Sequence, residues 1–90
     1  MKAKVHKSHP EIASRLKRAE GHLHTTIAMI EAGRSCLDLA QQLHAVERAI
    51  ANAKRTLIED HIDHCLETAA KKPNGARDRV HEFKRIARYL

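Results

Sequence analysis

The chain has 90 residues, of which 42% are hydrophobic and 31% are charged, and this fits one small domain. With one Tyr, one Phe and three Gly, the composition disfavours β-sandwiches, barrels and aromatic platforms for single-stranded nucleic acid. No stretch reaches the roughly 18 apolar residues of a membrane span, and no apolar signal-peptide segment follows the basic residues 1–9. We therefore expect a single all-α domain, residues 1–90, that is cytoplasmic and has no membrane partner.

The first predicted helix begins near Pro10. Ser8 lies three residues before Glu11, the spacing of a capping box, and proline is tolerated in the first helical turn. Residues 1–9 are expected to form a flexible basic arm. Apolar residues then recur every three or four positions until Ala32-Gly33 stops the helix. They are Ile12, Leu16, Ala19, Leu23, Ile27 and Ile30.

The second predicted helix is unusually long. The same period continues from Cys36 to Cys65, and neither Gly nor Pro follows before Pro73, so we expect about 30 residues spanning about 45 Å. The residues 73–75, Pro-Asn-Gly, predict a turn. Apolar residues between Val80 and Leu90 predict a third helix of about 14 residues with a basic outer face.

Such helices cannot close a bundle within one chain, because the middle one extends past its neighbours and leaves apolar positions in water. Two copies of the second helix packed antiparallel would bury these positions. We therefore expect an antiparallel helical homo-oligomer, at least a dimer.

Charge is concentrated at both ends of the chain. Residues 1–18 carry six basic and one acidic side chain (+5), residues 19–70 carry four and eight (−4), and residues 71–90 carry seven and two (+5), for a total of +6. Cationic surfaces of this kind most often meet a polyanion, and double-stranded DNA is the partner we expect. A solvated basic surface without a partner is the alternative.

A His-x-x-x-Cys pair on the second helix is the main candidate for metal chemistry. His61 and Cys65 lie one turn apart and point from the same face, so they can share one ion. Two cysteines are too few for a disulfide scaffold and indicate reduced thiols. A buried cysteine beside a satisfied histidine would give the same pattern.

Cys36 strengthens the case for a metal. It precedes His61 by 25 residues, or about 37 Å of helix, so the two cannot meet within one chain. In an antiparallel dimer, Cys36 of one subunit would reach His61 and Cys65 of the other and form two equivalent sites. Two thiolates and an imidazole suit copper(I), zinc or nickel(II).

Other histidines differ in how well they could serve as further ligands. His6 or His9 in the N-terminal arm would raise the coordination number and favour nickel or cobalt. His64 projects about 100° around the helix from Cys65 and is expected to face elsewhere. Surface or supporting positions are expected for His22, His24, His44 and His81.

Three segments resemble the CsoR/RcnR family of bacterial metal-sensing transcriptional repressors. They are residues 15–23 (Arg-Leu-Lys-Arg-Ala-Glu-Gly-His-Leu), residues 41–46 (Gln-Gln-Leu-His-Ala-Val) and residues 60–65 (Asp-His-Ile-Asp-His-Cys) together with Cys36. The resemblance covers almost the whole chain. It implies a dimer that pairs again into a tetramer, binds operator DNA without metal and releases it when metal binds. It implies neither an enzyme nor a small-molecule substrate.

The resemblance also bears on which metal is sensed. Cys36, His61 and Cys65 match the ligands of the copper(I) sensors. Two supporting positions differ, because Ser35 stands in place of a Tyr and His81 in place of a Glu on the third helix. The resemblance therefore favours nickel(II) or cobalt(II) as the effector, with copper(I) as the alternative and a thiol sensor of persulfides as a further one.

No helix-turn-helix or zinc finger can be recognised, so DNA would be held by a broad basic face. Its candidate residues are Arg15, Lys17 and Arg18 on the first helix and Lys54 and Arg55 on the second. The resemblance implies DNA contacts for Arg15 and Arg55. Exposed ion pairs of Lys17 or Arg18 with Glu11 or Glu20, worth about 0 to 1 kcal/mol, are the alternative.

Two other classes of protein remain open, and an enzyme is excluded because no catalytic triad, phosphate loop or paired carboxylates can be recognised. A metal-trafficking or storage protein would explain the Cys and His residues but not the basic ends. A nucleoid-type DNA-binding protein would explain the charge but not the predicted metal ligands.

Overall fold

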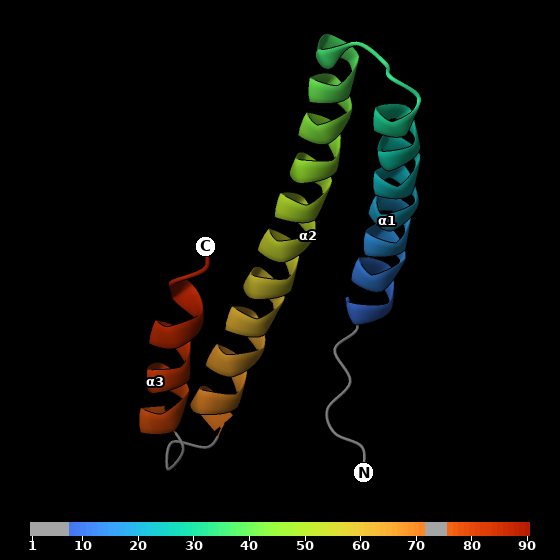
Figure 1. Ribbon diagram of the computed structural model, residues 1–90. Coiled ribbons are helices and arrows are strands. Elements are labelled where there is room, and N and C mark those ends of the chain that lie inside the picture. The colour runs from blue at the N-terminus through green and yellow to red at the C-terminus, as the bar shows by residue number, and fades with distance from the viewer. Residues whose placement is uncertain (1–7, 72–75) are drawn as a thin grey trace.

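The protein is a row of three helices, seen in a computed structural model that describes residues 8–71 and 76–90. They are α1 (His9–Glu31), α2 (Cys36–Lys71) and α3 (Ala76–Ala87). Helix α2 lies in the middle, and α1 and α3 run antiparallel to it on either side (Figure 1). Both contact α2 but not each other within the described ranges. The all-α prediction is confirmed.

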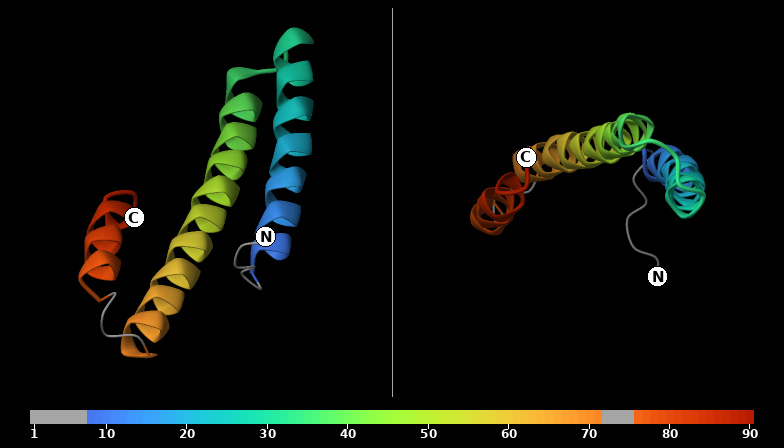
Figure 2. Two further views of the ribbon diagram at one scale, coloured as in Figure 1. Left: turned by 90° about the horizontal axis from the view of Figure 1, so that it is seen from below. Right: turned by 45° about the horizontal axis from the view of Figure 1, so that its top comes forward.

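The row is one layer thick. Two further views show α1, α2 and α3 side by side in one curved layer (Figure 2). The principal extents are 58 × 26 × 15 Å and the radius of gyration is 17.9 Å. A compact chain of this length would have a radius of gyration of about 12 Å. In the described part of the chain, no helix is long and apolar enough to cross a membrane.

The helix boundaries differ from the predicted ones in three places. Helix α1 begins at His9, so the last residue of the predicted arm is already helical, with Pro10 in the first turn. Helix α2 has 36 residues rather than about 30, and α3 has 12 rather than about 14. Helix α3 ends at Ala87, which leaves Leu90 beyond it. Residues 1–7 and the predicted turn lie outside the described residues.

The predicted capping box at the start of α1 is wrong. Ser8 has φ −79° and ψ −17°, which is a helical conformation, and its side chain makes no capping hydrogen bond. A capping side chain needs an extended backbone at this position to reach the free N–H groups. The Ser8 hydroxyl is instead buried without a hydrogen-bond partner among the described residues.

A tight turn joins α1 to α2. The N–H of Gly33 donates to Ile30 O and the N–H of Arg34 donates to Met29 O, both at 3.1 Å, which is the Schellman pattern. Gly33 has φ 75°, a conformation that costs other residues a steric penalty. Ser35 then caps α2, because its Oγ accepts the N–H of Asp38 at 3.1 Å. These bonds fix α1 and α2 as an antiparallel pair.

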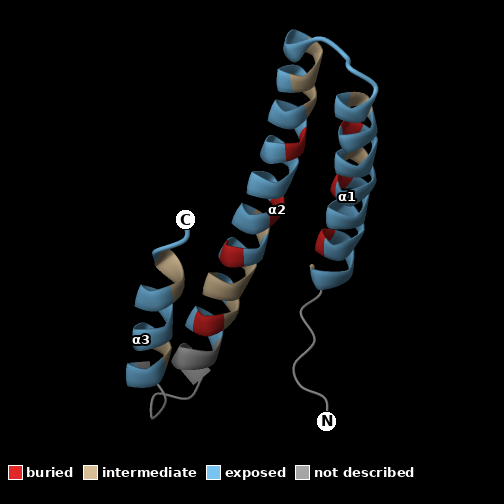
Figure 3. Cartoon of the chain, viewed as in Figure 1, coloured by how far each residue is buried: buried red, intermediate tan, exposed pale blue. Residues whose placement is uncertain are grey.

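The buried residues follow seven-residue lines along the helices (Figure 3). One line lies on α1, and a second line lies on the side of α2 that faces α1. A third line, also on α2, is displaced around that helix toward α3. Side chains that recur at this spacing stay on one face of a helix. The lines are Ile12, Ala19 and Thr26; Val46 and Ala53; and Ile58 and Cys65.

Two further seven-residue lines of large apolar side chains remain exposed. Each lies four residues after a buried line, so it is turned by about 40° from the α1–α2 contact. Because the two helices are antiparallel, this rotation brings both exposed lines to the same side of the pair. They are Leu16, Leu23 and Ile30 on α1, and Leu43, Ile50 and Leu57 on α2. We call this side the apolar face.

Candidate metal centre and cationic groove

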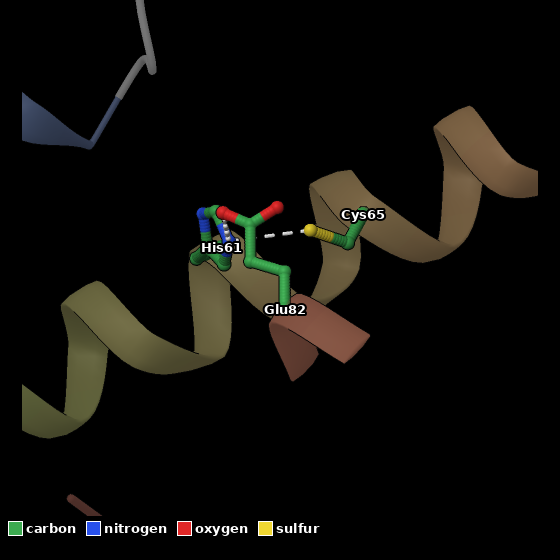
Figure 4. A group of neighbouring side chains, drawn as sticks. All are labelled: His61, Cys65 and Glu82. Atoms are coloured by element: carbon green, nitrogen blue, oxygen red, sulfur yellow. Dashed lines mark hydrogen bonds and ion pairs between the residues drawn. The ribbon is translucent and has the colours of Figure 1, made fainter. Parts of the chain in front are cut away.

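Three potential metal ligands converge where α3 packs against α2. They are His61, Cys65 and Glu82, and their ligand atoms lie within 4.8 Å of one another. The His61 Nε2 atom is 3.2 Å from Cys65 Sγ and 3.0 Å from Glu82 Oε2. Figure 4 shows the Glu82 carboxylate, from α3, turned toward the two side chains of α2.

The burial of this cluster is uneven. Cys65 is 5% exposed, His61 has 23% of its side chain exposed and Glu82 has 49%. A thiolate, an imidazole and a carboxylate can together hold zinc, nickel(II) or cobalt(II). These three donors leave coordination positions for further ligands on the exposed side. The residues present therefore fit a transition-metal ion with at least one more donor.

The residue that faces this cluster from α3 is Glu82, which corrects the assignment of His81 to this place. Glu82 lies one turn before Ile86, and both line a cavity with His61. His81 projects about 100° away and lines a separate groove beside Lys84. The partial burial of Ile86 against α2 marks the inward face of α3, and the spacing of Glu82 from it was the available sequence signal.

The other predicted ligands lie elsewhere in this chain. Cys36 is exposed at the first residue of α2, about 37 Å from His61 along the helix. His9 is exposed at the start of α1, and His64, though partly buried, is not in the cluster. His6 lies outside the described residues. Ser35, predicted as a supporting residue, caps the helix that begins with Cys36.

Cys36 nevertheless shares one strip of α2 with the cluster. At about 100° per residue, the direction of Cys36 falls about 20° from His61 and about 20° from Cys65, between the two. His61 is also one turn beyond Leu57, which belongs to the apolar face. The strip that carries the two thiols and the imidazole therefore borders the apolar face.

A groove with basic walls runs between α1 and α2. It encloses about 440 Å³ and is lined by Glu11, Arg15, Arg18, Ala19, His22, Ala49 and Asn52. Arg15 Nη2 lies 3.0 Å from Glu11 Oε2, and Arg55 donates to Asn52 Oδ1 at 3.4 Å. We call it the cationic groove.

The structure places the predicted DNA-contacting residues on different surfaces. Arg15 and Arg18 line the cationic groove, and Arg55 adjoins it through Asn52. Lys17 is exposed and is not among the lining residues. Lys54 lines a second groove, which Arg55 shares and which Leu90 closes.

The cationic groove and the apolar face lie on opposite sides of the α1–α2 pair. Apart from the buried Ala19, the groove residues come one residue before or three residues after a buried position. This turns them by about 60 to 100° in the sense opposite to the apolar lines. An assembly built on the apolar face would therefore leave the groove open to solvent.

Comparisons with known proteins agree with this architecture. The family model described as "Metal-sensitive transcriptional repressor" matches residues 8–88. The copper-sensing transcriptional repressor CsoR of Bacillus subtilis (strain 168) is 39% identical over 72 residues, which cover 80% of this chain and 71% of that protein. CsoR of Mycobacterium ulcerans is 36% identical over 62 residues, 69% of this chain and 53% of that relative.

The structural comparison extends over the whole chain. The nickel-responsive transcriptional regulator InrS has a TM-score of 0.83 and 28% identity, with 99% of this chain and 100% of that chain covered. The present chain spans about half the length of the mycobacterial relative and just over two thirds of the Bacillus one. The family model and the Bacillus relative both match most of the chain, which therefore belongs to the family of metal-sensitive transcriptional repressors.

Proposed function

We propose that this protein represses transcription by binding operator DNA in its metal-free state, and that it releases the DNA when nickel(II) or cobalt(II) binds between subunits. The observation that carries the proposal is the common strip of Cys36, His61 and Cys65 on α2. Membership in a repressor family implies DNA binding and oligomerisation. The assignment of the metal and of the operator complex is ours, as is the cytoplasm as the place of action.

The geometry of the apolar face supports a shared site. Consider two α2 helices packed antiparallel, with Cys36 of one opposite His61 and Cys65 of the other. Their two-fold axis then passes beside Ile50, which lies halfway along α2 between Cys36 and the His61–Cys65 pair. Ile50 is also the middle residue of the exposed line Leu43, Ile50 and Leu57. One dimer register would thus bury the apolar face and complete both metal sites. Two such dimers would pair into a tetramer.

The proposed DNA contact uses the cationic groove, which faces away from this dimer interface. Arg15 and Arg18 would bind phosphates there, and Arg55 adjoins it. A metal that bridges two subunits can release DNA only if it binds the released arrangement more tightly than the bound one. We propose that the N-terminal residues with His6 or His9 move toward the site and shift α1, which carries the groove.

Nickel(II) or cobalt(II) is favoured by His6 and His9 in the N-terminal region and by the likeness to a nickel-responsive regulator. Copper(I) is a second candidate with specific support. Glu82 beside His61 supplies a carboxylate whose absence had counted against copper, and several curated relatives are copper sensors. The alternative set for copper(I) would be Cys36, His61 and Cys65 alone.

The decisive experiment measures DNA release by each metal. Metal-free protein, kept reduced and anaerobic, is bound to a fluorescent duplex that it has selected from random-sequence DNA, and anisotropy is followed during titration. We expect release at about one nickel(II) or cobalt(II) per subunit, as the shared-site arrangement requires. Release that needs neither His6 nor His9 and occurs with copper(I) alone would assign the copper alternative. Binding that no metal alters would contradict the proposal.

A further inference from the structure

His22 lies in the cationic groove, although neither composition nor resemblance assigns it a role. It follows Arg15 and Arg18 by seven and four residues, so all three project from one face of α1. Together they extend over about 10 Å of the helix. An imidazole that lines a basic groove can become a third cation there.

The orientation of the His22 ring is set by α2. Its Nε2 atom is hydrogen bonded to Gln42 Oε1, a contact between α1 and α2 that is partly buried. Because a carbonyl oxygen only accepts hydrogen bonds, Nε2 carries the proton and donates. Nδ1 is then the nitrogen at which the neutral ring can take up a second proton. The Gln42 contact is compatible with both charge states of the ring.

We propose that His22 is a further nucleic-acid contact of this groove, and that it takes up a proton when a DNA phosphate enters. This inference rests on the proposed function. Without DNA, Arg15 and Arg18 oppose a positive charge on His22, whereas Glu11 favours it. The Glu11 carboxylate is, however, paired with Arg15. The groove residues from α2, Ala49 and Asn52, are uncharged, as is Gln42.

Entry of a phosphate reverses this balance. Duplex DNA carries one negative charge per about 1.7 Å of its axis, which attracts the protonated ring. Histidine changes its charge in the physiological pH range, so the contact is made without a large cost in protonation. DNA affinity should therefore rise as the pH falls, and this rise should depend on His22.

The test compares wild-type protein with H22Q and H24Q. Gln at position 22 keeps an N–H that can donate to Gln42 but cannot be protonated, and His24 is an exposed histidine of α1 outside the groove. The dissociation constant for the selected duplex is measured in EDTA at about pH 6 and about pH 8 over a range of salt concentrations, pH values chosen to bracket histidine titration.

For wild type and H24Q we expect tighter binding at the lower pH, with a log–log salt slope steeper by about 0.9 for each His22 that meets a phosphate. H22Q should bind with one slope at both pH values. If H22Q loses affinity equally at both pH values and wild type shows no greater pH dependence, His22 is only structural and the inference is wrong.

A calorimetric measurement on wild type makes the test independent of how H22Q folds. The heat of DNA binding near neutral pH, measured in two buffers of different ionisation enthalpy, gives the number of protons taken up. We expect net uptake that H24Q retains, and zero uptake would overturn the inference. Absence of DNA binding at either pH would instead overturn the proposed function, and this inference with it.

Discussion

A single ring nitrogen of His61 connects α2 to α3, because His61 Nε2 lies 3.0 Å from Glu82 Oε2. The same nitrogen is 3.2 Å from Cys65 Sγ. A metal that binds Nε2 must displace the carboxylate or share it, whereas a metal that binds Nδ1 leaves the contact between the helices in place. In the first case metal binding at His61 would alter the contact with α3, and in the second case Glu82 would orient the ring that holds the metal.

Substitution of Glu82 tests this coupling. Removal of a group that orients a metal-ligating histidine commonly lowers metal affinity by about 10- to 100-fold. We expect E82Q to show a loss in this range, measured by competition with a chelator of known affinity. H81Q is the matched control, since His81 lies next to Glu82 but faces another groove. Equal affinities for E82Q and H81Q would remove Glu82 from the centre.

Mixing two inactive variants tests whether the site is shared between subunits. C36A and C65A should each lose the thiolate-to-metal absorption of the nickel(II) complex. A heterodimer of the two retains one complete site, with Cys36 from one subunit and His61 and Cys65 from the other. We expect part of the absorption to return when the variants are unfolded and refolded together. No recovery in a verified heterodimer would contradict the shared arrangement.

Ile50 tests the proposed two-fold axis. Glu at this position would place two like charges against each other at the centre of the apolar face, which costs several kcal/mol. Ile50 is 46% exposed in the single chain, so the fold of each subunit should survive. We expect I50E to be a monomer by sedimentation and to lose the shared metal sites. R48E, an exposed position about 160° around α2 from the apolar line, should remain oligomeric.

The groove predicts different roles for neighbouring basic residues. R15A should weaken binding to all duplexes and reduce the salt slope by about 0.9 for each lost phosphate contact. K17A should have a smaller effect, because Lys17 does not line the groove. Anisotropy at several salt concentrations measures both. A larger change for K17A than for R15A would place the DNA on another surface.

Two glycine-to-alanine substitutions with opposite expected effects on stability test the turn between α1 and α2, one in the turn and one within α1. Gly33 has φ 75°, so G33A should destabilise the protein by about 1 to 2 kcal/mol. Gly21 lies within α1 and has open space around its Cα, so G21A should stabilise it by about 0.5 to 1 kcal/mol. Thermal unfolding followed by circular dichroism compares them. If G33A does not lower the midpoint, the turn does not have the conformation described.

Helix number and order could be predicted from sequence because Gly33 and the apolar period are strong local signals. The repressor family, which the three resembling segments and Cys36 indicated, is confirmed by the family match, and this family consists of repressors rather than enzymes. The supporting position on the third helix was assigned to His81, whereas Glu82 is the residue that meets His61. That choice depends on the rotation of α3 against α2, which a one-residue difference between His81 and Glu82 decides.

Local polar contacts were also hard to predict. Ser8 and Ser35 both precede an acidic residue by three positions, yet only Ser35 caps a helix. Ser8 already has helical dihedral angles and makes no capping hydrogen bond, whereas Ser35 follows the Gly33 turn and its Oγ accepts the N–H of Asp38. The three-residue spacing is the same in both places, so the spacing alone does not tell which serine caps its helix.

In the proposed shared site, the distance between Cys36 and His61 along α2 would make metal sensing depend on the concentration of subunits. A lone chain holds an incomplete set of the proposed ligands, so complete sites appear only as subunits associate. At concentrations below the dimer dissociation constant, their number falls with the square of the free-subunit concentration. A cell that makes little of this protein would respond weakly to metal, because a lone chain offers His61, Cys65 and Glu82 without the partner's Cys36.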